Sequence, residues 1–312
     1  MTGIGSPISN RVPIPHVIVP PPLPLRGILS IDKPSGISSY DVIRRVKPLL
    51  PRKTAIGHAG TLDPLASGVL LVLVGDATKV SRFLLDESKE YEAGILFGIR
   101  TDSDDITGQT VEQAAIPALD SEGIRAALGR FTGEIEQVPP SYSAMKQNGR
   151  PQYELARKGI EVLSRPRRVT IHELELCDWR PPRLALHCRV SSGTYIRALA
   201  RDLGTVLDSA ATLERLVRTA SGRFQIADAA ALDDVTTDSL PGLLTTIADA
   251  LPGLPRLDIT RADAARLLQG RRIPSAAPLA GPGLARTDDG RFLAVVRAEG
   301  VELLTERIIY AG

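Results

Sequence analysis

The sequence has few cysteines and no long apolar run. Its two cysteines, Cys177 and Cys188, are too few for a disulfide framework, and no segment resembles a secretory signal. The longest apolar run is well short of the roughly 20 residues that a membrane-spanning helix needs. We therefore expect a reduced, cytoplasmic protein without a transmembrane helix.

Several motifs of enzyme chemistry are also missing. The chain contains neither a GxxxxGK(S/T) phosphate-binding loop nor GxGxxG, and it has no GxSxG nucleophile elbow. His187 and Cys188 are neighbours in a predicted strand, so their side chains point to opposite faces and do not easily share one tetrahedral metal. These absences argue against a metal site and against a serine or cysteine nucleophile.

The formal net charge is only +2, but charge is segregated along the chain. Residues 99–136 carry eight acidic and three basic side chains, whereas residues 140–189 carry ten basic and five acidic ones. A second basic cluster lies between Arg44 and Lys53. One such cluster usually forms a solvated face. Two clusters that flank a candidate site favour an anionic ligand such as a nucleic acid.

Secondary-structure patterns predict an α+β fold. Dense prolines in residues 1–25 disfavour helix and central strand, so this segment is expected to be an extended or disordered tail. The predicted strands lie at 27–31, 69–74, 91–98, 169–177 and 184–190. The first predicted helix begins at Ser38 or Ser39 and ends before Pro48. Further helices are predicted at 76–85, 120–131, 194–207 and near 213–217. Because this order has no regular βαβ rhythm, it favours a mixed sheet.

Residues 256–312 are predicted to form a separate module. Pro252, Gly253 and Pro255 mark a boundary after the α+β region. Residues 256–312 contain one helix pattern at 261–268 and strand patterns at 292–297 and 301–304. We expect a small β-rich module there.

Residues 58–68, HAGTLDPLASG, hold the most informative carboxylate, Asp63. This stretch is expected to be a loop before the buried strand 69–74. An aspartate before proline is often only a turn residue. Flanking glycines let a ligand approach the backbone, His58 lies five residues upstream, and a rigid strand follows, all of which favour a site. A carboxylate nucleophile also needs a cation to keep it ionised, and Arg197 is one candidate among many arginines.

Several motifs together resemble one family, the bacterial tRNA pseudouridine-55 synthases of the TruB type. Residues 57–68 look like its catalytic motif, and residues 33–39, KPSGISS, resemble its N-terminal motif. Further similar segments are GDATK at 75–79, KEY at 89–91, PPSYSAMK at 139–146, YELARKG at 153–159, GTYIR at 193–197 and DLG at 202–204. The match runs over about residues 26–226. Residues 264–270 resemble the family's PUA-type RNA-binding module only distantly.

The resemblance implies a fold and a domain layout. The expected fold is an α+β pseudouridine synthase domain built on a mixed sheet, over residues 26–250, followed by a PUA-like module at 256–312. A basic, RNA-gripping insertion is expected at about 138–168. The proline-rich tail, 1–25, lies outside the family pattern.

The resemblance also implies an activity without any cofactor. Uracil of uridine 55 in the tRNA T loop would be flipped out, cut from its ribose, turned and rejoined through carbon 5. Asp63 would be the nucleophile, attacking either carbon 6 of uracil or carbon 1′ of ribose, a choice that stays open. Tyr91 would stack on the base and help remove the proton from carbon 5, and Arg197 would pair with Asp63.

Further residues follow by position in the family. The nucleotide contacts would be His58, Tyr195 and Leu216, and contacts to the RNA backbone are expected from Lys146, Arg150, Arg157 and Lys158. The partner would be the T arm of tRNA, bound by a monomer that needs no protein partner. The alternatives are a guide-dependent RNA pseudouridine synthase and a non-catalytic tRNA-binding or tRNA-folding protein.

Overall fold

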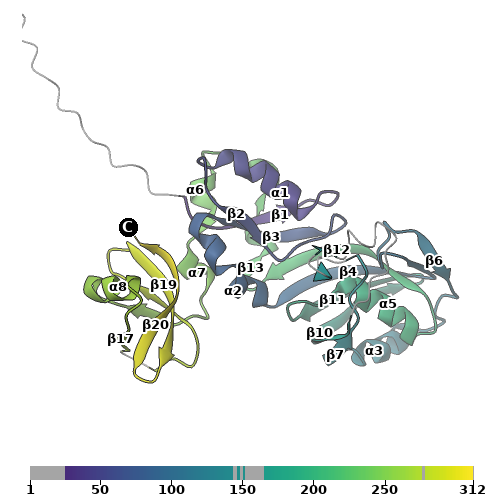
Figure 1. Cartoon of the computed structure of the whole chain (residues 1–312). Helices are drawn as coiled ribbons and strands as arrows, with labels where there is room; N and C mark the ends of the chain where they lie inside the picture. The colour runs from purple at the N-terminus through teal and green to yellow at the C-terminus, as the bar shows by residue number, and fades with distance from the viewer. Residues whose placement is uncertain (1–24, 143–145, 148–149, 152–164, 276–277, 312) are drawn as a thin grey trace, which may run out of the picture.

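The computed structural model describes residues 25–142, 146–147, 150–151, 165–275 and 278–311. Its largest sheet has eleven strands (Figure 1). They are β1 (Gly27–Lys33), β2 (Ile56–Ala59), β3 (Ser67–Val74), β4 (Lys89–Phe97), β7 (Gly133–Gln137), β10 (Arg167–Arg180), β11 (Arg183–Val190), β12 (Ala211–Ser221), β13 (Phe224–Gln225), β14 (Ala230–Ala231) and β15 (Leu244–Thr245).

The helices and short helical turns between these strands cover the large sheet. They are α1 (Ser39–Val46), η1 (Lys47–Leu49), η2 (Gly75–Val80), α2 (Ser81–Asp86), α3 (Ser121–Gly129), α5 (Ile196–Val206), η3 (Ile226–Asp228), η4 (Leu232–Asp234), α6 (Leu240–Leu243) and α7 (Ile247–Ala250). Ser38 is the N-cap of α1. Its side chain accepts a hydrogen bond from the backbone N–H of Asp41, and the Asp41 carboxylate accepts one from the backbone N–H of Ser38.

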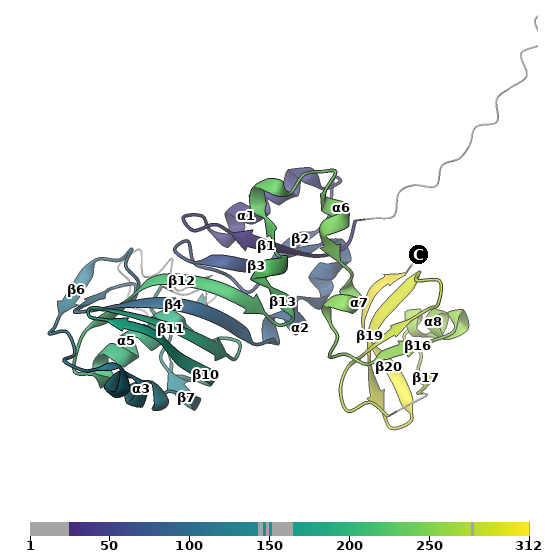
Figure 2. The same ribbon diagram turned by 180° about the vertical axis from the view of Figure 1, so that it is seen from behind.

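The large sheet is mixed. Its main order is β14–β1–β3–β12–β4–β11–β10–β7. The β1–β14 and β3–β12 pairs are parallel, whereas the other pairs along this path are antiparallel. Figure 2 shows the same sheet from behind, with α3 and α5 together beside β10 and β11. The predicted α+β class with a mixed sheet is confirmed.

β3 is an interior strand of the large sheet and is buried on both of its faces. Leu70, Val72 and Val74 pack with buried residues of α1 in one apolar cluster. Leu71 and Leu73 point the other way, into a second cluster with η2, α2 and the C-terminal sheet. Alternating side chains of one apolar run therefore build two cores, as expected for a strand buried on both sides.

The C-terminal region forms a five-stranded sheet of order β16–β18–β19–β20–β17, together with helix α8 (Arg261–Leu268). Its strands are β16 (Arg256–Asp258), β17 (Ile273–Pro274), β18 (Gly283–Arg286), β19 (Phe292–Glu299) and β20 (Glu302–Ala311). The Lys79 ammonium donates to the carbonyl of Ile309, and the Arg26 guanidinium lies 3.5 Å from the centre of the Tyr310 ring. These contacts join β20 to the residue before β1 and to η2, which follows β3.

The remaining described strands form two small pairs, β5 (Ile99–Thr101) with β6 (Thr110–Gln113) and β8 (Lys146–Gln147) with β9 (Arg150–Pro151). None of the helices in the described parts of the chain is long and apolar enough to cross a membrane.

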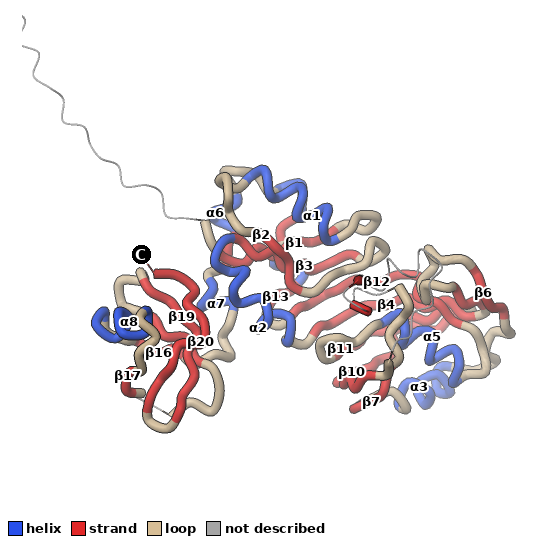
Figure 3. Tube along the Cα trace, in the orientation of Figure 1, coloured by secondary structure: helices blue, strands red, loops and turns tan. Residues whose placement is uncertain are grey.

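Two local predictions were wrong. Residues 213–217 are not helical but belong to β12, which Figure 3 draws as a strand. A register shift between Leu213 and Arg215 places an extra residue in the strand, so the buried Leu213 and Leu216 mimic helical spacing. In addition, both ends of the predicted loop 58–68 are strand, because His58 and Ala59 belong to β2 and Ser67 and Gly68 belong to β3.

Candidate active site

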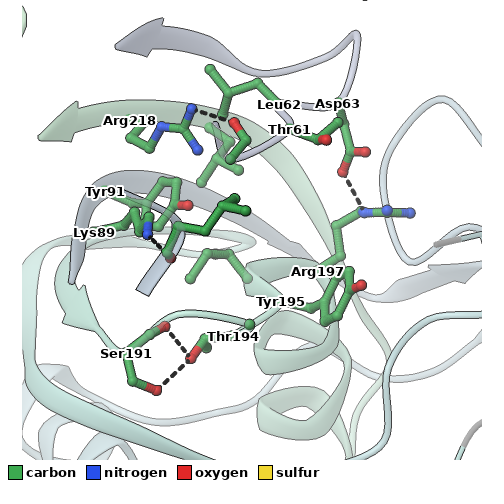
Figure 4. Close-up of a pocket in the computed structure, with 15 residues that line it drawn as sticks. Thr61, Leu62, Asp63, Lys89, Tyr91, Ser191, Thr194, Tyr195, Arg197 and Arg218 are labelled. Carbon is green, nitrogen blue, oxygen red and sulfur yellow. Dashed lines mark hydrogen bonds and ion pairs between the residues drawn. The ribbon is translucent and has the colours of Figure 1, made fainter. Parts of the chain in front are cut away.

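A cavity of about 300 Å³ lies between the loop that precedes β3, the strands β4 and β12, and the start of α5. Five residues predicted from the family resemblance line it, although they are far apart in sequence. They are Asp63, Tyr91, Tyr195, Arg197 and Leu216. Figure 4 shows the two tyrosines and the Asp63–Arg197 pair around this cavity. The fold therefore brings together the three proposed catalytic residues and two of the three proposed nucleotide contacts.

The loop that carries Asp63 is held by the turn that follows β1 and by Ser39, the first residue of α1. The Ser39 hydroxyl donates to the carbonyl of Leu62 at 2.9 Å and accepts from the Leu62 N–H at 2.8 Å. The backbone N–H of Gly36 donates to the carbonyl of Pro64 at 2.7 Å. These bonds fix the residues on both sides of Asp63. Asp63 is also a turn residue, since its carbonyl accepts from the N–H of Ala66.

Arg197 is the ion-pair partner of Asp63. Its Nε lies 2.9 Å from Oδ2 of Asp63, and its side chain is only 6% exposed. Its Nη1 donates to the carbonyl of Ser103, and its Nη2 donates to the carbonyl of Tyr142, both at 2.8 Å. With the guanidinium held by two carbonyls, the ion pair has a fixed geometry at the edge of the cavity.

A second carboxylate, Asp105, stands behind the arginine. Its Oδ2 lies 3.6 Å from Nη1 of Arg197, and its side chain is 8% exposed. Its Oδ1 accepts hydrogen bonds from Ser103 and Thr107. Arg197 thus lies between the Asp63 carboxylate, which lines the cavity, and the buried Asp105 carboxylate. The acidic segment 99–136 was visible in the sequence, but no local pattern distinguishes Asp105 from the exposed acidic residues of that segment, such as Asp102 and Asp120.

The pKa of Asp63 is raised above its usual value. Burial is the main cause, and the negative charge of Asp105 adds to it, whereas Arg197 and Lys33 act against it. The side chain keeps 41% of its surface open toward the cavity. A carboxylate that is crowded by protein yet reachable suits attack on a bound group better than a fully buried one does.

Two lysines that the sequence reasoning missed are buried next to the site. Lys33 ends β1 and donates to the carbonyls of Pro34 and Ile37, which shapes the turn that holds the Asp63 loop. Lys89 begins β4 and donates to carbonyls at the end of α2. Burial lowers the pKa of each ammonium to about 8. Both lay in segments noted for their resemblance, but their burial depends on contacts distant in sequence.

Tyr91 and Tyr195 are fixed by their backbones. Tyr91 lies within β4, opposite Cys188 of β11 and Arg218 of β12, and is 8% exposed. The N–H of Tyr195 donates to the side-chain oxygen of Gln137 at 2.8 Å, and the Gln137 amide donates back to the Tyr195 carbonyl at 3.1 Å. The backbone on each side of the cavity is therefore anchored, while the aromatic rings face it.

His58 does not line this cavity. It lies on β2 opposite Val72, and its Nδ1 is buried without a hydrogen-bond partner among the described residues. Burial, and after it the charge of Arg218, lower the pKa of the imidazole. A neutral ring is therefore favoured.

The expected RNA-backbone contacts fall on or beside the undescribed parts of the chain. Lys146 and Arg150 lie on the small hairpin β8–β9, of which only the backbone pairing is described. Arg157 and Lys158, like residues 1–24 of the tail, are outside the described residues. Within the described ranges, no three His, Cys, Asp or Glu side chains are grouped so that they could hold a metal ion.

Solved structures share this fold. A chain in the crystal structure of a Cbf5–Nop10–Gar1 complex matches with a TM-score of 0.68 and 24% identity, over 91% of this chain and 85% of that one. A chain in the structure of an H/ACA RNP bound to a substrate RNA containing 2′-deoxyuridine matches with a TM-score of 0.67 and 22% identity, over 91% and 84%. At this level of identity the likeness establishes the fold.

Sequence families define the class. Residues 47–196 match the family described as TruB family pseudouridylate synthase (N terminal domain), and residues 254–308 match tRNA pseudouridine synthase II, C terminal. The fold and these matches are those of a pseudouridylate synthase. The tRNA pseudouridine synthase B of Azoarcus sp. (strain BH72) is 42% identical over 91% of this chain and 94% of its own length. That of Symbiobacterium thermophilum is 46% identical over 78% and 82%. The chain belongs to the TruB family.

Proposed function

We propose that this protein isomerises uridine 55 in the T loop of tRNA to pseudouridine. The observation that carries the proposal is the Asp63–Arg197 pair at the edge of a base-accessible cavity that Tyr91, Tyr195 and Leu216 also line. The high identity to tRNA pseudouridine synthases B over most of the chain supports tRNA as the substrate.

Asp63 is the nucleophile in this proposal. Its carboxylate attacks carbon 6 of uracil or carbon 1′ of the ribose, which divides one difficult substitution into easier steps. Arg197 keeps the carboxylate ionised and oriented, which burial alone opposes. Neither role needs a cofactor, because the base is both the leaving group and the group that is rejoined.

The cavity accounts for the other roles. Tyr91 stacks on the uracil and helps to remove the proton from carbon 5, while Tyr195 and Leu216 contact the nucleotide. The target base must leave the T loop to reach Asp63, so the reaction requires base flipping. His58 lies on β2 and does not line the cavity, so it would contact the nucleotide only if the loop that follows β2 shifts on binding.

The proposed assembly is a cytoplasmic monomer that binds the T arm without a protein partner. Residues 26–250 form the catalytic domain in this proposal, and the basic insertion at about 138–168 grips the RNA backbone through Lys146, Arg150, Arg157 and Lys158. Residues 256–312 form a PUA-like module. The share of each curated relative that the chain covers supports a stand-alone enzyme.

Tritium release tests the proposed reaction. An unmodified tRNA transcript labelled with tritium at carbon 5 of its uridines is incubated with the protein, and a transcript with cytidine in place of uridine 55 is the matched control. We expect release that corresponds to one uridine from the first transcript and none from the second. Equal release from both transcripts would refute the assignment to position 55, and no release from either would refute the activity.

A further inference from the structure

Arg218 is among the largest fully buried side chains of the described protein. It lies on β12 and is 1% exposed. Its guanidinium nevertheless reaches the wall of the active-site cavity, across from Tyr195 and Arg197 (Figure 4). None of the roles carried over from the family resemblance uses it.

The guanidinium bonds to both ends of the loop that carries Asp63. Its Nη2 donates to the carbonyl of Gly60, and its Nε donates to the carbonyl of Val69, each at 2.7 Å. Between these two carbonyls runs the whole segment that presents the carboxylate. A planar group with several donors can hold two carbonyls at once, whereas the single ammonium of a lysine lacks this fork.

Two glycines permit this close approach. At Gly60, whose φ is +79°, a Cβ atom would lie 3.3 Å from Nη1 of Arg218. At Gly68, whose φ is +97°, a Cβ atom would lie 2.2 Å from the Arg218 carbonyl oxygen. The loop backbone is therefore pressed against Arg218 at both of its ends, in conformations that only glycine adopts without strain.

The charge of Arg218 has no acidic partner. Within the described ranges, no carboxylate lies at ion-pair distance from its guanidinium, unlike that of Arg197. Its charge contributes, after burial, to the lowered pKa of Lys33 and of Lys89. A buried, unpaired charge costs stability, and an apolar side chain of the same size would pack without that cost. An apolar residue could not form the two hydrogen bonds to the Asp63 loop.

We propose that Arg218 is a positioning residue that clasps the two ends of the Asp63 loop and so sets the carboxylate at the distance that attack requires. The inference rests on the proposed function and adds a residue to it. Displacement of a reacting group by about 1 Å is enough to slow a reaction about 100-fold. Loss of the clasp therefore lowers kcat and leaves tRNA binding nearly intact.

Three variants test the clasp by single-turnover and steady-state tritium release. For Arg218→Lys, which keeps the charge but loses the fork, we expect kcat to fall about 10- to 100-fold with KM within about threefold of wild type. For Gly60→Ala, which crowds Nη1 from the loop side, we expect a fall in kcat of the same kind. For Arg218→Ala, added guanidinium ion should restore part of kcat, and it should restore nothing in Asp63→Asn.

Asp120→Ala is the matched control, because it removes the side chain that caps α3 and touches neither the Asp63 loop nor the cavity lining. It should lower Tm and leave kcat unchanged. The proposal is overturned if folded Arg218→Lys keeps wild-type kcat, or if its loss falls wholly in KM. If Arg218→Ala does not fold, Arg218→Lys and Gly60→Ala decide the question. Inactivity of the wild-type protein on uridine 55 would instead refute the proposed function.

Discussion

The cavity over the large sheet and the five-stranded C-terminal sheet differ in how far their charged side chains are buried. Around the cavity, Arg197 and Asp105 are almost fully buried and belong to one chain of contacts that ends at Asp63. On the C-terminal sheet, the Arg286–Asp258 pair is just as short, 2.8 Å, but its side chains are 42% and 74% exposed. The distance between the charged atoms therefore does not show which ion pair contributes to the chemistry of the site.

The difference shows where the protein buries charged groups in spite of the free-energy cost of removing them from water. Exposed pairs contribute little because water and salt screen them. Buried pairs must recover the cost of leaving water, and they often do no better than apolar packing. Buried charge concentrated around one cavity is thus better explained by chemistry than by stability.

Among the residues that support Asp63, the largest expected effect comes from Arg197, the centre of the buried network. Arg197→Met removes the cation between Asp63 and Asp105, so the two carboxylates lose their common partner and Asp63 loses its orientation. We expect kcat to fall about 10²- to 10³-fold with little change in tRNA affinity. Single-turnover tritium release and filter binding measure the two quantities. A variant with nearly wild-type kcat would show that the buried pair is only structural.

Asp105 is expected to have a smaller effect on rate and a distinctive effect on pH dependence. Since its charge raises the pKa of Asp63, Asp105→Asn should lower that pKa and move the acid limb of the pH–kcat profile to lower pH. In the wild type this limb should lie above the ordinary aspartate value of 3.8, because Asp63 must be ionised to act. Because Arg197 loses a contact when Asp105 is replaced, its guanidinium is held less firmly. We therefore expect kcat at neutral pH to fall about tenfold.

The pH profiles of both proteins, measured at saturating tRNA, check this prediction. Glu134→Gln, on a solvent-exposed ion pair with Arg168, is a control that changes charge away from the cavity. An acid limb that stays in place or moves to higher pH in Asp105→Asn would contradict the proposed coupling.

The smallest effect is expected on the C-terminal sheet. Arg286→Ala removes the exposed pair with Asp258, so the free energy of unfolding should change by no more than about 0.5 kcal/mol, and kcat should stay at the wild-type value. Urea denaturation followed by circular dichroism measures the first quantity. A loss of several kcal/mol would mean that this exposed pair stabilises the protein as much as a buried one.

Much of the fold could be predicted from local pattern. The apolar run 69–74 became the central strand β3, and Ser38 became the cap of α1. The fold class was confirmed. Strand β12 was missed because a bulge near Glu214 disturbs the alternation that identifies a strand. The β-rich C-terminal region was predicted from its strand patterns, but its packing against η2 was not.

The site could be predicted only in part. Asp63 by itself looked like a turn residue, and the ordered set with Tyr91 and Arg197 made it a candidate nucleophile. The structure brings these three together around one cavity. Asp105 and Arg218 were missed because their importance lies in burial and in contacts with residues far along the chain. No spacing rule in a single sequence reveals such contacts.

Asp63 is the reacting group in the proposed mechanism, and the substitution Asp63→Asn tests this role. The substitution keeps the shape of the side chain and removes its charge. Single-turnover reactions with tRNA tritiated at carbon 5 of uridine 55 should release no tritium above background, while filter binding should show nearly wild-type tRNA affinity and Tm should not fall. Tritium release at a rate close to wild type would contradict the account.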